Sequence, residues 1–323
     1  MTEIVHHTVD ANGIKIHYAE AGAGPLVVLC HGWPESWYSW RHQLMALAEA
    51  GYRAVAPDMR GYGQTDRPEA VDQYTMFHLV GDIVGLLDAL GAGQAVIAGH
   101  DWGAPVAWTC AQLRPDRFRA VIGLSVPFVP RRSVRPTSAM PQTDDAQFYQ
   151  LYFQKEGEAE AEFERDPAAT IRGLLFGLSG DAPPRRADAP AGMVSRKGGF
   201  LGGRAAPTTL PPWLTEADIA YYAGEFTRSG FRGGLNWYRN IDRNWELTAP
   251  FTGLQVKVPA LYVAGDRDSV VAFPGMDKLI PNLKMFVPEL HNTIILPGCG
   301  HWTQQERAPE VNAAMIEFLR SLG

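Results

Sequence analysis

The sequence has little cysteine, no long apolar run and no excess of positive charge. Its three cysteines, Cys30, Cys110 and Cys299, show no C-x-x-C spacing and are too few for a disulfide framework, so we expect buried, reduced thiols. No apolar run reaches the ~18 residues that span a bilayer, and the N-terminal segment lacks the basic and apolar parts of a secretory signal. The net charge of −6 argues against a polyanionic partner. We therefore expect a cytoplasmic protein that binds neither nucleic acid nor membrane.

The order of apolar patterns indicates a mainly parallel sheet covered by helices. An apolar content of 46% and 20% charged residues are ordinary for a globular protein, and 323 residues allow one large α/β domain with an insertion. Strand-like and helix-like patterns alternate over the first ~125 residues and again after residue 260, which is typical of α/β proteins. The predicted strands are 26–30, 95–98, 118–124, 260–264 and 293–296, and the predicted helices are 76–90, 104–113 and 311–322.

The stretch between residues 130 and 250 has a different character. Residues 144–164 are polar with interspersed aromatics, and we predict a helix there. Residues 179–212 are rich in Pro, Gly, Ala and Arg, and a loop of that length in a compact domain is functional or partly mobile. Thr215 and Asp218 have the spacing of a capping pair that opens another helix. We interpret the whole stretch as an insertion that covers the carboxyl edge of the sheet.

One motif carries most of the chemical information. Gly99-His100-Asp101-Trp102-Gly103 lies between a predicted strand and a predicted helix, which is the context of a nucleophile elbow. The common form of this turn is G-x-S-x-G, which occurs nowhere in the chain, and Asp101 takes the place of its serine. A carboxylate is already an anion, so it can attack a saturated carbon that bears a leaving group and form an ester of the enzyme. The motif therefore indicates epoxide opening or halide displacement, and an ordinary turn aspartate is the alternative.

A histidine and an acid complete the predicted triad. His301 lies in the glycine-rich loop 298–302, between the last predicted strand and the last predicted helix. Hydrolases with this elbow carry the nucleophile, the acid and the histidine in that order, so we expect His301 to be the base. The acid orients the imidazole and stabilises its protonated form. Asp266 and Asp268 both follow the strand 260–264; we favour Asp268, which lies further into the turn, and Asp266 is the open alternative.

The motif His31-Gly32-Trp33-Pro34 ends another predicted strand. We expect the main-chain N–H groups of Trp33 and Trp102 to form an oxyanion hole, which stabilises negative charge on a tetrahedral intermediate. A simple proline-containing turn is the alternative.

These motifs resemble those of the epoxide hydrolases of the α/β-hydrolase fold. The closest resemblance is to the soluble type, including the C-terminal hydrolase domain of the mammalian enzyme, and it covers nearly the whole chain. It is carried by the residues at 31–34, 58–63, 99–103 and 300–301 and by lid-like segments at 148–154 and 230–239. The resemblance implies a mainly parallel central sheet with helices on both faces and an inserted, mostly helical lid. We expect residues 1–130 and 248–323 in the core and 131–247 in the lid.

The resemblance also implies how the reaction proceeds. Asp101 attacks the epoxide, two lid tyrosines donate to its oxygen, and His301 with Asp268 then activates a water that hydrolyses the ester to a vicinal diol. By position the tyrosines are Tyr149 and Tyr222, with the neighbours Tyr152 and Tyr221 as near alternatives. A phenol has a pKa near 10, so it can donate a hydrogen bond without being ionised at neutral pH.

A pocket and a set of partners follow from the same resemblance. The peptide between Trp33 and Pro34 is expected to be cis. The residues expected to line the pocket are His31, Trp33, Pro34, Trp102, Gln150 and Trp302. The partners are a small-molecule epoxide and water, with no metal and no cofactor, and a homodimer is one assembly open to the chain.

Three other functions compete with this interpretation. A haloalkane dehalogenase would use the same Asp101, His301 and Asp268 triad and would hold the halide with Trp102. It would also need a second donor, Asn or Trp, directly after His31-Gly32, and the chain has Trp33 at that position. It would not need a tyrosine pair in the lid. A serine-type esterase is disfavoured by Asp101 itself, and a non-catalytic binding protein would be expected to lack a member of the triad.

Overall fold

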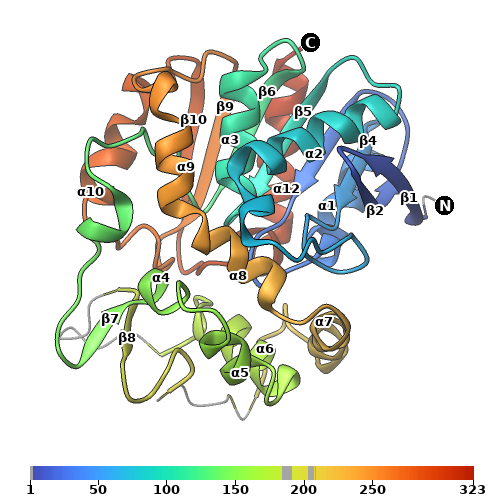
Figure 1. The fold of residues 1–323 in the computed structure, drawn as a ribbon. Coiled ribbons are helices and arrows are strands. Elements are labelled where there is room, and N and C mark those ends of the chain that lie inside the picture. The colour runs from blue at the N-terminus through green and yellow to red at the C-terminus, as the bar shows by residue number, and fades with distance from the viewer. Residues whose placement is uncertain (1–2, 184–190, 203–206, 208) are drawn as a thin grey trace.

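The central sheet has eight strands in the order β1-β2-β4-β3-β5-β6-β9-β10. The computed structural model describes residues 3–183, 191–202, 207 and 209–323. β2 is antiparallel to β1 and to β4, and the other neighbouring strands are parallel. Figure 1 shows this sheet in the upper body of the molecule. The strands are β1 Val5–Ala11, β2 Ile14–Ala21, β3 Leu26–Cys30, β4 Arg53–Pro57, β5 Ala95–His100, β6 Phe118–Leu124, β9 Ala260–Gly265 and β10 Leu290–Leu296.

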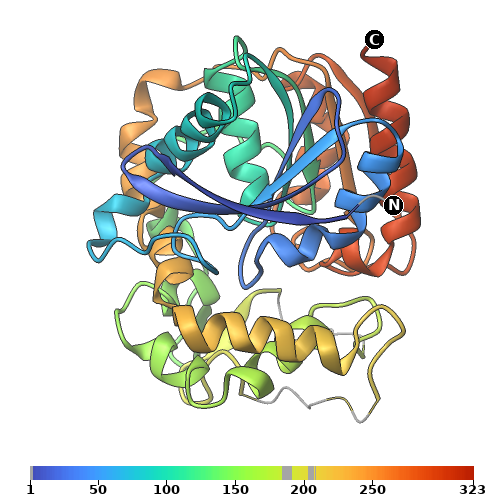
Figure 2. The same cartoon turned by 90° about the vertical axis from the view of Figure 1, so that its right-hand side faces the viewer.

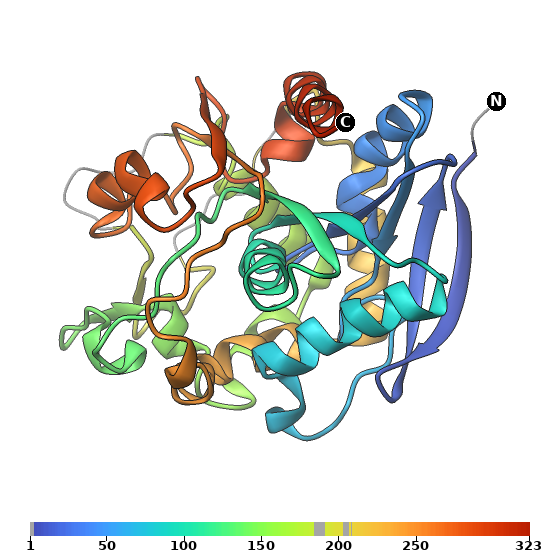
Figure 3. The ribbon, with the colours of Figure 1, turned by 90° about the horizontal axis from the view of Figure 1, so that it is seen from above.

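Helices cover both faces of the sheet, because alternate side chains of each buried strand point to opposite faces. In β3, Val28 and Cys30 pack in the cluster that contains α2 and α3, whereas Val27 and Leu29 pack in the cluster that contains α1 and α12. Figure 3 shows these two helix layers on either side of the strands. The core helices are α1 Arg41–Glu49, α2 Met76–Ala89, α3 Gly103–Leu113, α10 Met276–Leu279, α11 Thr303–Glu306 and α12 Ala308–Ser321. The predicted α/β-hydrolase architecture and the strands and helices predicted for the core are confirmed.

The chain between β6 and β9 forms a second body beneath the carboxyl ends of the parallel strands (Figures 1 and 2). Its elements are β7 Ala146–Phe148, α4 Tyr149–Tyr152, α5 Glu158–Phe163, α6 Pro167–Gly177, β8 Met193–Ser195, α7 Glu216–Ser229 and α8 Arg232–Arg239, and α9 Ile241–Leu247 returns to the core. The capping pair predicted for α7 is confirmed, since Thr215 and Asp218 exchange hydrogen bonds. Part of the segment 179–212 lies outside the described residues. Over the described chain, no helix combines the length and apolarity needed to cross a membrane.

The single helix predicted for 144–164 is wrong. Residues 146–148 form β7, which pairs with β8, and two short helices follow. Gly157 separates those helices with a φ of +82°, a left-handed conformation that a continuous α-helix does not contain. The result is a bent segment in which Tyr149 and Gln150 lie half-buried at the start of α4.

Candidate active site

Asp101 lies at a sharp elbow between β5 and α3, and its φ of +49° is unusual for a non-glycine residue. The elbow depends on glycine at both ends. A Cβ added to Gly99 would lie 2.0 Å from the carbonyl oxygen of Gly103, and one added to Gly103 would lie 2.1 Å from that of Cys30. The turn therefore holds the Asp101 carboxylate at the end of β5, where it is 9% exposed.

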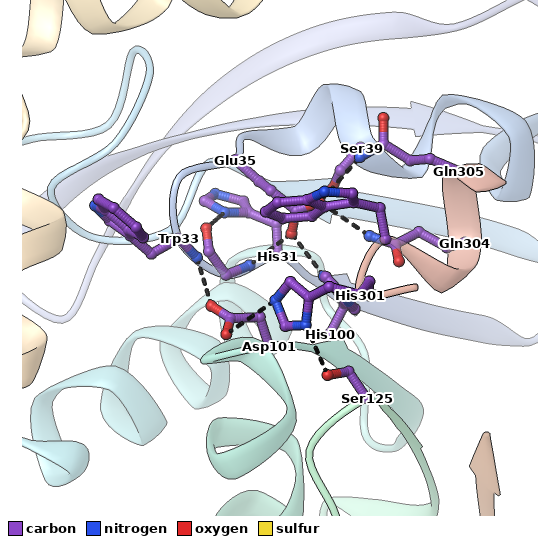
Figure 4. Close-up of polar contacts among 12 residues, drawn as sticks. His31, Trp33, Glu35, Ser39, His100, Asp101, Ser125, His301, Gln304 and Gln305 are labelled. Atoms are coloured by element: carbon purple, nitrogen blue, oxygen red, sulfur yellow. Dashed lines mark hydrogen bonds and ion pairs between the residues drawn. The ribbon is translucent and has the colours of Figure 1, made fainter. Parts of the chain in front are cut away.

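The loop after β3 supplies a donor to this carboxylate. The main-chain N–H of Trp33 donates to Asp101 Oδ1 at 2.7 Å (Figure 4). A Cβ on Gly32 would lie 2.3 Å from Asp101 Oδ1 and 2.6 Å from the Trp102 nitrogen, so the two predicted oxyanion-hole residues approach the carboxylate beside this glycine. The peptide between Trp33 and Pro34 is cis, as the resemblance implied.

His301 lies between two carboxylates. Its Nε2 is 3.4 Å from Asp101 Oδ2, and its Nδ1 is 3.0 Å from Asp268 Oδ1. Asp266 lies elsewhere: its Oδ1 accepts the main-chain N–H of Gly298, and its side chain is exposed. Asp268 is therefore the acid that contacts the imidazole.

The charges of this trio are set by burial and by their mutual attraction. Burial opposes charge on His301, but Asp268 and Asp101 outweigh it and hold the pKa of His301 well above its ordinary value. Burial also opposes charge on Asp268, and the attraction of His301 together with hydrogen bonds from His301 and Ser125 lowers the pKa of Asp268. The charged forms of His301 and Asp268 therefore stabilise one another.

Ser125 supports the acid from the end of β6. Its hydroxyl donates to Asp268 Oδ2 at 2.6 Å. The same hydroxyl lies 3.1 Å from His301 Nδ1 (Figure 4). The residue is fully buried with a φ of +68°, and its carbonyl accepts the hydroxyl of Tyr262 at 2.7 Å. The sequence analysis did not identify Ser125, because its contact with Asp268 depends on β6 and β9 being neighbours in the sheet.

A second buried contact between a histidine and a carboxylate lies close to His301 (Figure 4). Glu35 and His100 are each fully buried in their side chains and approach to 2.7 Å, and His100 Nε2 donates to the carbonyl of His301 at 2.7 Å. A carbonyl can only accept, so Nε2 carries a proton. Glu35 also accepts from the side-chain amides of Gln304 and Gln305. The pair joins the loop after β3 to the loop that carries His301, and the sequence contained no signal for it beyond the motif residue His100.

An aromatic wall faces Asp101 from the inserted segment. Tyr238 on α8 packs edge-on against Trp102 at a ring-centroid distance of 5.1 Å, and Tyr149 on α4 lies 5.8 Å from Tyr238. Burial and then the negative charge of Asp101 raise the pKa of Tyr149, and the same two causes raise that of Tyr238. Both phenols therefore stay protonated at neutral pH, and the charge of the Asp101 carboxylate acts on both.

Tyr222 does not belong to this wall, which corrects the prediction made from its position. It lies on α7, is fully buried, and donates its hydroxyl to Gln305 Oε1 at 3.2 Å. Burial raises its pKa, and the charges that act on it are those of Arg41, Glu35 and Asp218. The near alternatives are also occupied: Tyr152 donates to Glu162, and the ring of Tyr221 stacks on Tyr38. Two further buried phenols, Tyr238 on α8 and Tyr62 in the core, have Asp101 among the charges that raise their pKa. Of these, Tyr238 belongs to the inserted segment that also carries Tyr149.

The remaining predicted pocket residues divide into two groups. The Gln150 amide donates to the hydroxyl of Tyr149 at 3.1 Å, and Trp33 packs against Tyr238 at 6.0 Å, so both adjoin the aromatic wall. His31 and Trp302 support the loops: the ring nitrogens of His31 bond to the backbone of Gly32 and Met59, and the indole of Trp302 donates to the Leu175 carbonyl.

Known proteins are similar to this chain in sequence and in architecture. A family model of the α/β-hydrolase fold matches residues 25–196. The chain is 46% identical over 318 residues to epoxide hydrolase A of Mycobacterium tuberculosis, which covers 97% of each protein. It is also 46% identical over 327 residues to epoxide hydrolase 3 of Siraitia grosvenorii, with 99% of each covered. Among solved structures, an epoxide hydrolase from an endophytic Streptomyces superposes with a TM-score of 0.95 at 46% identity, over 99% of this chain and 96% of that one.

Proposed function

We propose, from the premise that the chain belongs to the epoxide hydrolases of the α/β-hydrolase fold, that it hydrolyses epoxides to vicinal diols through a covalent ester on Asp101. The observation that carries this mechanism is the setting of the carboxylate. Trp33 N–H holds Oδ1, while Oδ2 faces His301 Nε2 across 3.4 Å. One oxygen is thus fixed by a main-chain donor at 2.7 Å, and the other, which His301 contacts at a longer distance, is the one we expect to attack.

In the first half-reaction, Asp101 Oδ2 forms a bond to one epoxide carbon. The bond from that carbon to the epoxide oxygen breaks, and its electron pair goes to the oxygen. Tyr149 and Tyr238 donate to this oxygen, and one of the two phenols passes it a proton. The support for this pair is that both phenols come from the inserted segment, that Tyr238 packs on Trp102 and Tyr149 lies beside Tyr238, and that the Asp101 charge acts on both. A donor aimed at a developing alkoxide stabilises the transition state more than the ground state.

In the second half-reaction, His301 changes from acid form to base. Esterification removes the negative charge of Asp101, one of the charges that raise the pKa of His301. The pKa falls, and the imidazolium gives its proton to the phenolate left by the first half-reaction. The neutral imidazole then accepts a proton from a water that attacks the ester carbonyl carbon. The negative charge then collects on the oxygen beside the N–H groups of Trp33 and Trp102. The bond from the carbonyl carbon to the ester oxygen breaks, and the departing alkoxide takes the proton from His301 and is released as part of the diol. Asp101 is left as a carboxylic acid, and it passes its remaining proton to His301.

The inserted segment supplies the phenols, and we infer that residues 131–247 act as a lid over a core of residues 1–130 and 248–323. The partners of the reaction are a small-molecule epoxide and water. A cytoplasmic location and a homodimer are proposals that rest on the sequence alone.

The function is tested with purified enzyme and styrene oxide. We expect formation of the vicinal diol, no bromide release from a bromoalkane, and loss of both diol and covalent ester in Asp101→Ala. Bromide release at a rate similar to epoxide turnover would favour the dehalogenase instead.

A further inference from the structure

Glu306, the last residue of α11, holds both neighbours of His301. Its Oε2 accepts the main-chain N–H of Gly300 at 2.8 Å, and its Oε1 accepts that of Trp302 at 2.9 Å. One carboxylate therefore fixes the peptide on each side of the imidazole that faces Asp101. Burial raises the pKa of Glu306, while the three main-chain donors that it binds oppose that rise.

The third of those donors comes from the inserted segment. Gly180, which follows α6, donates its N–H to Glu306 Oε2 at 2.8 Å. A Cβ on Gly300 would lie 2.2 Å from the Gly180 nitrogen, so the two backbones touch. Beside them, the N–H of His301 donates to the carbonyl of Leu178 at 2.9 Å. The segment 178–180 thus lies directly on the loop that carries His301.

The loop is held from the opposite side as well. The carbonyl of His301 accepts from His100, so both main-chain groups of this residue are bound. Arg267 reinforces the contact through its hydrogen bond to the Gly180 carbonyl. With these contacts in place, the position of the His301 imidazole depends on a carboxylate that itself touches no reacting atom.

We propose that Glu306 is a positioning residue that couples the lid segment 178–180 to the hydrolytic half of the reaction. The proposal rests on the function proposed above, because it assigns to His301 the hydrolysis of the ester and not its formation. Removing the carboxylate releases three main-chain donors and lets the His301 loop shift. A shift of about 1 Å in a reacting group lowers a rate about 10²-fold. Asp101 is held by its own elbow and by Trp33, so ester formation is largely independent of Glu306.

The test compares Glu306→Ala and Glu306→Gln with a matched control, Glu310→Gln. Glu310 lies four residues further along the chain, on α12, and its exposed carboxylate pairs with Arg307. Enzyme in excess is mixed with styrene oxide, and the reaction is quenched at intervals. Mass spectrometry of the intact protein then gives the fraction that carries the ester. We expect Glu306→Ala to form the ester at nearly the wild-type rate and to hydrolyse it about 10²-fold more slowly. Glu306→Gln keeps one acceptor oxygen, so its defect is smaller but in the same step, and it decides the question if the alanine variant does not fold.

Two results would overturn the positioning role: wild-type ester hydrolysis in Glu306→Gln, or equal slowing of ester formation and hydrolysis. A loss of folding lowers the amount of active enzyme and leaves the ratio of the two rates unchanged. His301→Gln is run in parallel. If no ester forms even there, the proposed function itself fails; if ester accumulates there while the Glu306 variants behave as wild type, only the role of Glu306 fails.

Discussion

Replacing Tyr238 with phenylalanine should slow the formation of the ester and leave its hydrolysis nearly unchanged. Phenylalanine keeps the ring that packs on Trp102 at 5.1 Å and removes only the hydroxyl. A hydrogen bond to a charged group contributes about 1.5–3 kcal/mol, and each 1.36 kcal/mol changes a rate about tenfold. With Tyr149 still in place, the expected slowing of ester formation is therefore about 10- to 150-fold.

The matched control is Tyr222→Phe, because it removes a hydroxyl of the same kind whose hydrogen bond goes to Gln305. Its partner is the neutral side chain of Gln305, so the cost is about 1 kcal/mol of folding stability. Rapid quenching with intact-mass measurement gives both rates for each variant. Slower ester formation in Tyr222→Phe than in Tyr238→Phe would refute the assignment of the donor pair.

Two further predictions concern His301 and Glu35. His301→Gln should let the ester accumulate, seen as a mass increase equal to one epoxide on the intact protein, because the carboxylate still attacks but no base activates the water; a variant that turns over without mass increase would contradict this. Although burial opposes it, His100 lowers the pKa of Glu35, so the unfolded chain binds this proton first as the pH falls. The contribution of Glu35 to the free energy of unfolding is therefore complete above its ordinary pKa of about 4.5, and it is lost as the pH falls through the lower pKa of the folded state. Urea unfolding between pH 6 and pH 3 should show a steeper decline of the unfolding free energy for wild type than for Glu35→Gln. Parallel declines of the two proteins would contradict this prediction.

The sequence predicts the parts of the site that local geometry fixes. The elbow needs glycine where a side chain would strike the backbone, so Gly99 and Gly103 mark Asp101 without knowledge of the fold. The nearness of the nucleophile, the acid and the histidine follows from the carboxyl ends of parallel strands meeting at one edge of the sheet. These features predict Asp101 and His301 from spacing, whereas the choice of Asp268 over Asp266 is decided only by the contact of Asp268 with His301 in the structure.

The second tyrosine could not be found in this way, because α7 and α8 both carry tyrosines and the choice depends on how each helix packs. Gly234 brings α8 close to the core: a Cβ there would lie 2.6 Å from both Trp33 Cδ1 and the hydroxyl of Tyr62. That close approach carries Tyr238, one turn later, against Trp102. The glycine pair at 233–234 was the signal in the sequence.

Hydrogen-bond partners that are distant along the chain could not be predicted from the sequence either. Ser125, Glu35 and Glu306 acquire their roles from residues that are 143, 65 and 126 positions away along the chain. Buried polar groups must find partners within the fold, but which groups meet is decided only when neighbouring strands and loops are brought together.

The most direct test of the account follows the oxygen atoms through a single turnover in water enriched in ¹⁸O, with enzyme in excess over epoxide. If the water attacks the carbonyl carbon of an Asp101 ester, the label appears in the Asp101 carboxylate, and the first diol released carries none. Label in the diol with none in Asp101 would mean that water opens the epoxide directly, and the covalent mechanism would be wrong.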